Sequence, residues 1–229
     1  MNIYIVRHAE SHNNTGGRFC THTDGGLTTI GELQAEYCRQ HLDHIKFDKV
    51  YSSHLIRAIR TAQIVGGKED VIQYKELAEL HGGDYESKTW EELDKLDPGF
   101  YIKLINALST IQMPNGESYE CVKKRLLEFV NKELINSALN KESNILIVSH
   151  GMTLRILINL LMGKSDQDVN SLHWADNTAI THIGLDKEIK LYNLLSNKHL
   201  IDNGMDRSSY DRWAGKKHVA NKHIEYIDL

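Results

Sequence analysis

Short apolar runs alternate with longer amphipathic segments along the chain. Six runs are predicted to be β-strands, because they are rich in β-branched residues or alternate in polarity: residues 2–6, 49–52, 71–74, 144–148, 179–185 and 189–194. The segments between them repeat apolar residues at helical spacing: residues 29–42, 55–65, 89–108, 118–139 and 152–162. Strands that alternate with helices predict an α/β fold, in which helices are layered on a mostly parallel sheet.

Local signals refine the predicted helices. Thr29 is followed three residues later by Glu32, which predicts a capping box at the start of the first helix. Pro98-Gly99 predicts a break inside the segment 89–108. The segment 118–139 is expected to be the clearest helix, because its apolar residues form one stripe.

The chain is expected to form one domain over residues 1–229, because its length lies in the usual range for a single domain. No internal repeat, low-complexity stretch or linker divides it. The last part, about residues 203–229, is a polar tail without a clean period. The sequence leaves open whether this tail is a lid, a partner-binding arm or partly disordered.

Charge and cysteine content restrict the class of protein. Lys plus Arg is 27 and Asp plus Glu is 31, a formal net charge of −4, which argues against nucleic acid or an anionic membrane as a partner. Cys20, Cys38 and Cys121 are widely spaced and odd in number, as expected for reduced thiols. Arg7 interrupts the apolar N-terminus too early for a signal peptide, and no run is long enough for a membrane span. We therefore expect a soluble cytoplasmic protein, either a monomer or a homodimer.

Two histidines each follow a predicted buried strand after one further residue. His8 comes after NIYIVR and His150 after NILIVS. Because the carboxyl ends of parallel strands meet at one edge of a sheet, the two imidazoles are expected to share a crevice. Arg7 and Arg57 also lie near strand ends, and planar guanidinium groups bind phosphate oxygens in pairs of hydrogen bonds. Together these residues predict a pocket for a phosphoryl group. Arg60 lies three residues after Arg57 and further from the strand end, so it is expected to lie on a solvated helix face.

The order and spacing of these motifs resemble the histidine phosphatase superfamily, the phosphoglycerate mutase-like proteins. The resemblance spans residues 3 to about 200. Five stretches carry it: VRHAESHNN at 6–14, LTTIGELQAE at 27–36, SSHLIRAIRTAQI at 52–64, ELAELHGGDYE at 76–86 and VSHGMTLR at 148–155. Weaker matches are NGES at 115–118, Asn177-Thr178 and Asn193 with His199-Leu200. The resemblance implies a three-layer α/β/α sandwich, with a helical insertion at about 87–116 that forms part of the site wall.

The resemblance also implies roles for the pocket residues. His8 is expected to be the nucleophile, which takes the phosphoryl group as a phosphohistidine while its imidazole is neutral. His150 is expected to be protonated in the transition state. The residues expected to bind the phosphate oxygens are Arg7, Asn14, Arg57, His150 and Gly151.

Glu79 matches the proton donor of the family, which protonates the leaving alcohol and then activates water. Glu76 and Glu86 are rival carboxylates and rank below it. The chain departs from the family at Ala9, at Thr21 and over residues 82–87, and these changes leave the identity of the leaving alcohol open.

A metal site is disfavoured by the spacing of the histidines. His8 and His12 are four residues apart but are expected to lie on a loop. His41 and His44 share a predicted helix but lack a third ligand. We therefore expect no metal and no cofactor.

The choice between phosphatase and mutase depends on residues 87–115. Phosphoglycerate mutases of this family place a pair of arginines there for the substrate carboxylate, whereas this segment has only Lys88, Lys95 and Lys103 as basic residues. This favours a metal-independent phosphomonoesterase acting on a small phosphorylated metabolite.

Arg18, Arg207 or Arg212 could still bind a substrate carboxylate. A bisphosphoglycerate-dependent mutase, with 2,3-bisphosphoglycerate as its cofactor, therefore remains the alternative. The second alternative is a non-catalytic module that binds a phosphate ligand. Phosphosugars, phosphoglycerate, phosphoserine and nucleotide-like esters all remain open as substrates.

Overall fold

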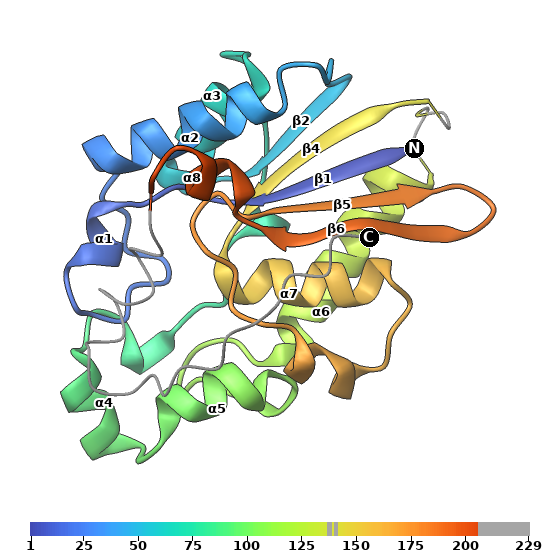
Figure 1. Ribbon diagram of the computed structural model, residues 1–229. Coiled ribbons are helices and arrows are strands. Elements are labelled where there is room, and N and C mark those ends of the chain that lie inside the picture. Colours follow the sequence, from blue (N-terminus) through green and yellow to red (C-terminus); the bar gives the residue numbers. More distant parts are fainter. Residues whose placement is uncertain (137–138, 140–141, 206–229) are drawn as a thin grey trace.

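The computed structural model describes residues 1–136, 139 and 142–205 (Figure 1). Its centre is a six-stranded sheet with the order β3-β2-β4-β1-β5-β6. The strands are β1 Asn2–Arg7, β2 Lys49–Ser53, β3 Ile72–Tyr74, β4 Asn144–Ser149, β5 Ile180–Leu185 and β6 Ile189–Ser196. The first four are parallel to one another, and β5 and β6 add antiparallel pairs at one edge. The predicted mixed α/β fold with a mostly parallel sheet is confirmed.

Helices cover both faces of the sheet. The α-helices are α1 His12–Thr15, α2 Thr29–His41, α3 Ile56–Gly66, α4 Trp90–Leu96, α5 Phe100–Asn106, α6 Tyr119–Phe129, α7 Gly151–Leu161 and α8 Lys198–Asp202. Short 3₁₀ turns lie at Lys75–Leu77, Gly83–Tyr85, Leu108–Thr110 and Asp166–Ser171. In Figure 1, α2, α3 and α8 lie on one side of the sheet and α6 and α7 on the other, so the molecule has three layers.

The alternation of side chains in β1 explains the two apolar layers. Ile3 and Ile5 belong to the cluster that includes residues of α6 and α7, whereas Tyr4 and Val6 belong to the cluster with α2 and α3. All four side chains are buried. A central strand that is apolar on both faces is typical of a sheet covered by helices on both sides.

Two helix predictions need correction. The first helix is capped by Thr28 rather than Thr29, because the extended backbone at Thr28 lets its hydroxyl accept a hydrogen bond from Gly31 N at 3.0 Å. Glu32 pairs with Arg60. The helix expected over 118–139 is α-helical only to Phe129 and continues as a π-helix over Val130–Ile135. Residues 137–138 and 140–141 lie outside the described residues.

The helical insertion lies at the end of the molecule where α4 and α5 are labelled in Figure 1. Phe100 and Leu104 are buried in the main apolar cluster. The break predicted at Pro98-Gly99 falls between α4 and α5, where Gly99 has φ of 77°. Most of the polar tail expected over 203–229 lies outside the described residues, which end at Met205.

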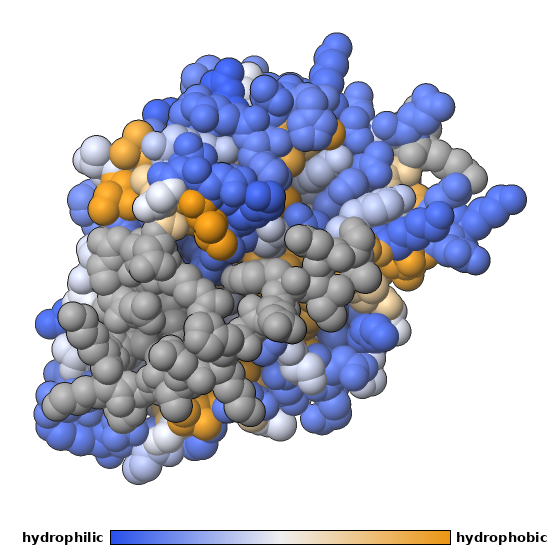
Figure 2. Space-filling view, viewed as in Figure 1, coloured by the Kyte–Doolittle hydropathy of each residue, from blue (hydrophilic) through white to orange (hydrophobic). Residues whose placement is uncertain are grey.

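The described surface in Figure 2 is mostly hydrophilic, as the share of charged residues in the sequence leads one to expect. On the face drawn in Figure 2, hydrophilic residues predominate outside the grey atoms, and the apolar residues form small separate groups. None of the helices in the described residues has the length and hydropathy that a membrane span requires.

Candidate active site

The register of β1 against β4 brings the two histidines together. Arg7 pairs with Ser149, and the N–H of His8 donates to Ser149 O at 2.9 Å, so His8 and His150 leave neighbouring strands at the same level. The centres of their rings are 5.0 Å apart, and both side chains are buried. The expectation that two strand ends deliver both imidazoles to one place therefore agrees with the geometry.

The hydrogen bonds of His8 fix its tautomer. Nδ1 lies 2.7 Å from the carbonyl oxygen of Ala9, which can only accept, so the ring proton is on Nδ1. Nε2 accepts a hydrogen bond from Nε of Arg57 at 3.3 Å. The lone pair of the imidazole is therefore on Nε2, on the side of Arg57.

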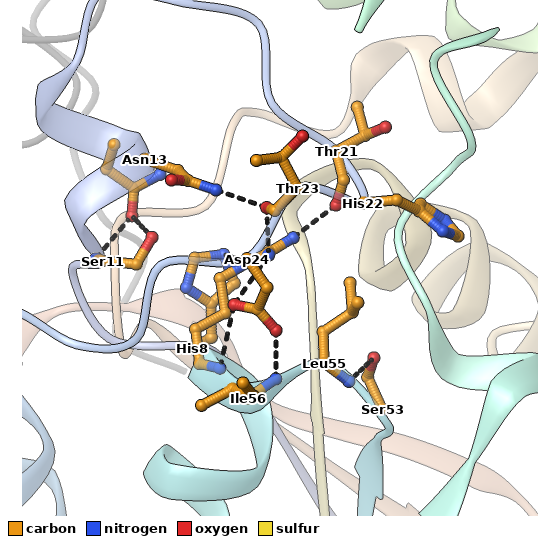
Figure 3. Close-up of polar contacts among 12 residues, drawn as sticks. His8, Ser11, Asn13, Thr21, His22, Thr23, Asp24, Ser53, Leu55 and Ile56 are labelled. Atoms are coloured by element: carbon orange, nitrogen blue, oxygen red, sulfur yellow. Dashed lines mark hydrogen bonds and ion pairs between the residues drawn. The ribbon is translucent and has the colours of Figure 1, made fainter. Parts of the chain in front are cut away.

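Arg57 is held by the loop that precedes α2. Nη2 donates to Thr21 O at 2.5 Å, and Nη1 donates to Thr23 O at 3.2 Å and to Asp24 Oδ1 at 3.3 Å. The Asp24 carboxylate also accepts hydrogen bonds from the backbone N–H groups of Ile56 and Arg57, which open α3. Figure 3 shows this turn of Thr21, Thr23 and Asp24 beside His8. Arg57 is thus anchored through most of its donors while one edge faces His8.

Arg7 is fixed from the other side of the pocket. Nη1 donates to Ala175 O at 2.6 Å, and its guanidinium carbon lies 5.8 Å from the centre of the Trp174 ring. Among the described residues, Arg7 Nε and both ring nitrogens of His150 are buried without a hydrogen-bond partner. Buried polar atoms without partners are costly, and a bound phosphate oxygen could accept hydrogen bonds from Arg7 Nε and from the one N–H group of a neutral His150 ring.

Burial and the neighbouring cations control the charge of the two imidazoles. Burial, followed by Arg57 and Arg7, lowers the pKa of His8 well below its ordinary value. Burial, followed by Arg57 and His8, does the same to the pKa of His150. Burial also lowers the pKa of Arg7 to about 10, so this guanidinium stays charged at neutral pH. Without a ligand both histidines are neutral, as a nucleophile requires. Protonation of His150 would need the negative charge of a bound phosphoryl group.

Asn14 and Gly151 complete the expected phosphate-binding set. Asn14 Oδ1 accepts from Ser11 N at 3.0 Å and from Asn177 Nδ2 at 3.4 Å, which leaves its NH₂ group as the donor for a ligand. Gly151 is the first residue of α7. A Cβ atom there would lie 2.9 Å from Trp174, so glycine permits this close packing.

Glu79 lies against the first turn of α7. Its Oε1 atom accepts hydrogen bonds from Leu80 N at 2.9 Å, Thr153 N at 3.0 Å and Thr153 Oγ1 at 3.0 Å. Its Oε2 atom accepts only from Met152 N, at 3.1 Å, among the contacts of the described residues. Oε2 is therefore the oxygen with capacity left to carry a proton.

Most of these residues line one pocket that has both polar and apolar walls, but His150 and Gly151 are not among its lining residues. The described residues that line it are Arg7, His8, Ser11, Asn13, Asn14, Phe19, Cys20, Thr21, Arg57, Glu79, Met152 and Trp174. None of them comes from the insertion at 87–116. The insertion supports the wall from behind, because the ring of Phe19 packs against Trp90 and Phe100.

The rival residues are placed elsewhere. Glu76 does not line the pocket, and the carboxylate of Glu86 accepts hydrogen bonds from the loop of Thr21. Arg60 is on the surface and pairs with Glu32 at 2.8 Å. Arg18 donates to Ser87 O at 2.8 Å, and the tail arginines are outside the described residues.

The histidines considered for metal binding are dispersed. His12 begins the short helix α1 instead of lying on a loop. His41 lies near His199, and His44 is exposed beside Asp43. In the described part of the chain, no group of three His, Cys, Asp or Glu side chains is arranged to hold a metal ion. Cys20 lies in the pocket wall, Cys38 is buried and Cys121 is exposed.

The sequence analysis assigned no role to four of the residues that build this site. Asp24, Phe19, Met152 and Trp174 act through contacts with residues distant in the chain. Asn177 was part of a weak match, and its Nδ2 donates to the carbonyl of His8 at 2.8 Å. Of these residues, only Met152, in the stretch VSHGMTLR, and Asn177 lie in motifs that carried a sequence signal.

Comparison with known proteins defines the class. The family model of the histidine phosphatase superfamily (branch 1) matches residues 3–198, so the chain belongs to this superfamily. The prediction that the chain is a phosphatase of the histidine phosphatase type is confirmed, because it belongs to this superfamily and its relatives include named phosphatases.

Three relatives illustrate the relationship. A Hydrogenobacter thermophilus protein named "Putative phosphoserine phosphatase 2" is 34% identical over 190 residues, which cover 81% of this chain and 90% of the relative. The adenosylcobalamin/alpha-ribazole phosphatase of Salmonella typhimurium is 32% identical over 164 residues, covering 71% and 80%. The crystal structure of the alpha-ribazole phosphatase from Shigella flexneri has a TM-score of 0.74 and 29% identity, covering 86% and 96%.

Proposed function

We propose that this protein is a metal-independent phosphomonoesterase that hydrolyses a small phosphorylated metabolite through a phosphohistidine at His8. One observation carries the proposal: the Nε2 lone pair of a neutral His8 faces a buried pocket between two guanidinium groups. A neutral imidazole is a nucleophile, and fixed cations stabilise the negative charge of a transferring phosphoryl group.

In the first step, His8 Nε2 attacks phosphorus while the bond from phosphorus to the ester oxygen breaks. Arg7, Arg57 and His150 stabilise the three equatorial oxygens, and the guanidinium groups supply the charge that a metal ion provides in other phosphotransferases. Glu79 Oε2 donates its proton to the leaving alcohol. The products of this step are the free alcohol and phosphohistidine.

In the second step, water takes the place of the alcohol. Ionised Glu79 removes a proton from this water, whose oxygen attacks phosphorus as the bond to Nε2 breaks. Inorganic phosphate leaves, His8 regains its lone pair, and Glu79 is protonated again for the next cycle. All bonds and protons balance without a cofactor.

The walls beyond the phosphoryl group favour a neutral leaving alcohol with an apolar surface. Phe19, Cys20, Met152 and Trp174 are the less polar residues among those that line the pocket. Among the described lining residues, the only permanent cations are Arg7 and Arg57, which the phosphoryl group itself would occupy. A carboxylate on the substrate therefore finds no further guanidinium or ammonium partner among the described residues that line the pocket.

Hydrolysis in the presence of a chelator tests the proposal. We expect p-nitrophenyl phosphate and benzyl phosphate to be hydrolysed in EDTA, and His8→Ala to lower kcat/KM by a thousandfold or more, about 4 kcal/mol of barrier. Benzyl phosphate is expected to be a better substrate than 3-phosphoglycerate, as measured by released phosphate.

Other outcomes distinguish the alternatives. Conversion of 3-phosphoglycerate to its isomer at a higher rate than hydrolysis, with 2,3-bisphosphoglycerate added, would establish a mutase. Tight phosphate-ester binding without turnover would establish a binding module. Activity of His8→Ala equal to that of the unaltered protein would refute the phosphohistidine step.

A further inference from the structure

The loop of residues 18–24 supplies the oxygen atoms that hold Arg57. Thr21 O and Thr23 O accept from the guanidinium at 2.5 and 3.2 Å. This loop contains no helix or extended strand, apart from an isolated bridge between Arg18 and Thr89. Its conformation therefore depends on contacts made by other segments.

The carboxylate of Glu86 organises the loop. It accepts hydrogen bonds from the N–H groups of Thr21 at 2.9 Å, His22 at 3.1 Å and Thr23 at 2.8 Å. It also accepts the hydroxyl of Thr21 at 2.6 Å. Burial acts to raise the pKa of Glu86, but the hydrogen bonds from Thr21 and Thr23 outweigh it and lower the pKa below its ordinary value. Three consecutive N–H groups thus converge on one ionised carboxylate.

A single peptide group links Glu86 to Arg57. The N–H of His22 and the carbonyl of Thr21 belong to the same amide, and they bond to Glu86 and to Arg57 respectively. A hydrogen bond at one end of an amide polarises the other end, so the carboxylate strengthens Thr21 O as an acceptor. The chain of contacts continues from Arg57 Nε to the nucleophilic nitrogen of His8.

We propose that Glu86 is a positioning residue, which holds the loop of residues 21–23 so that Arg57 faces His8 and the phosphoryl group. This proposal rests on the proposed function, because it assigns to Arg57 the binding of phosphate. Glu86 itself does not touch the substrate in this role, since both of its oxygens are engaged by the loop.

Glycine at position 82 permits this arrangement. The N–H of Gly82 donates to Thr21 Oγ1 at 2.9 Å, so the same hydroxyl joins the two segments. A Cβ atom on Gly82 would lie 3.0 Å from Glu86 Oε2 and 3.1 Å from Thr21 Oγ1. A side chain there would require both oxygens to shift.

The loop remains attached when the carboxylate is changed. Ser87 N donates to Phe19 O at 2.7 Å, and Phe19 N donates to Lys88 O at 2.8 Å. These backbone pairs do not involve the side chain of Glu86. Glu86→Gln therefore affects the turn at residues 21–23, where an amide NH₂ would face N–H donors, and it leaves the loop docked.

The experiment compares Glu86→Gln with Asp84→Asn. Asp84 is an exposed carboxylate on the same turn, and it contacts Asn115 instead of the loop. With p-nitrophenyl phosphate in EDTA, we expect Glu86→Gln to lower kcat/KM on the order of 10- to 100-fold, the usual range for a residue that orients an active-site group. We expect it to raise KM and the inhibition constant of inorganic phosphate, whereas Asp84→Asn stays within about twofold of the unaltered protein.

KM and the inhibition constant of phosphate distinguish a role of Glu86 in positioning Arg57 from damage to the fold. A partly unfolded variant lowers kcat in proportion to its active fraction and leaves KM and the phosphate inhibition constant unchanged. Such a result, or a match between Glu86→Gln and Asp84→Asn in all three parameters, would overturn the proposal. If Glu86→Gln does not fold by circular dichroism, Glu86→Asp replaces it, and the same rise in the phosphate inhibition constant is expected.

A double-mutant cycle tests the route through Arg57. In an Arg57→Met background, Glu86→Gln is expected to change kcat/KM by less than about threefold, because its target is already absent. An equal loss in both backgrounds would show that Glu86 acts elsewhere. If the unaltered protein hydrolyses no phosphate ester, the proposed function fails instead, and the effect of Glu86→Gln on phosphate affinity is then measured by calorimetry.

Discussion

Two buried arginines, Arg57 and Arg155, bond to backbone carbonyls in different ways. Each lies near the start of a helix that follows a parallel strand, and their exposed fractions are 2% and 0%. Arg155 donates to the carbonyls of Leu104, Ile105 and Val169, with no carboxylate among its hydrogen-bond partners in the described residues. Arg57 bonds to loop carbonyls, to Asp24 and to the neutral imidazole of His8.

The partners determine what each guanidinium does. The carbonyls of Leu104 and Ile105 belong to the last turn of α5, whose oxygens have no partner within the helix, so Arg155 ties the insertion to α7. Arg57 Nε donates to the neutral imidazole of His8 at 3.3 Å, and an anion can replace this uncharged partner. Arg155 therefore stabilises the fold, whereas Arg57 faces an exchangeable partner and can bind a ligand.

Removal of Arg57 is expected to give the largest effect on activity. Arg57→Met should lower kcat/KM for p-nitrophenyl phosphate about a thousandfold, because a preorganised donor to the phosphoryl oxygens is lost. The free energy of unfolding should also fall, because Thr21 O, Thr23 O and Asp24 lose their donor, so the activity is measured at temperatures where the variant is folded. Arg60→Met is the matched control, since Arg60 lies one turn further along α3 and pairs with Glu32 on the surface. Retention of more than a tenth of the activity by Arg57→Met would remove the distinction between the two buried arginines.

Removal of Arg155 is expected to act on stability. Arg155→Met leaves three carbonyls without their charged donor, which should lower the free energy of unfolding by about 3 kcal/mol in urea. At temperatures where the variant is folded, kcat/KM should fall much less than in Arg57→Met. Arg39→Met, on the exposed side of α2, should change the unfolding free energy by less than about 0.5 kcal/mol. An unchanged urea midpoint for Arg155→Met would contradict the role in the fold.

The sequence was sufficient to place the strands and the histidines because these depend on local patterns. The apolar runs at 2–6 and 144–148 are each followed by a motif that contains a histidine. The parallel register of the two strands then places the two histidines side by side. Arg57 could be separated from Arg60 by its distance from the strand end. The roles assigned to these residues in catalysis stay predictions.

The contacts that hold the side chains could not be predicted in the same way. Arg155 was visible in the motif VSHGMTLR, but its partners are backbone oxygens about 50 positions earlier and 14 later. Backbone acceptors have no signature in the sequence. The same holds for Glu86, whose partners are N–H groups of the loop at 21–23. The π-helix was also hidden, because the apolar stripe continues through it.

Burial lowers the pKa of both arginine and histidine, but it has different consequences for their charge near neutral pH. Burial lowers the pKa of Arg155 to about 10, so this side chain remains charged at neutral pH. Burial likewise lowers the pKa of His199 to about 4, so this side chain is neutral in the folded protein above pH 5. In the unfolded chain a histidine titrates near pH 6.5. As pH falls from 7 to 5, the unfolded state therefore binds a proton that folded His199 does not, and stability is lost.

This difference gives the smallest of the expected effects. His199 should account for about 2 kcal/mol of the stability lost between pH 7 and pH 5, which is smaller than the change expected for Arg155→Met. The free energy of unfolding of His199→Gln should consequently fall about 2 kcal/mol less over this range than that of the unaltered protein, in urea titrations at both pH values. His44→Gln is the control, because His44 is exposed beside Asp43. Equal pH dependence in His199→Gln and the unaltered protein would show that His199 takes up its proton without unfolding, and burial would then not explain the contrast with Arg155.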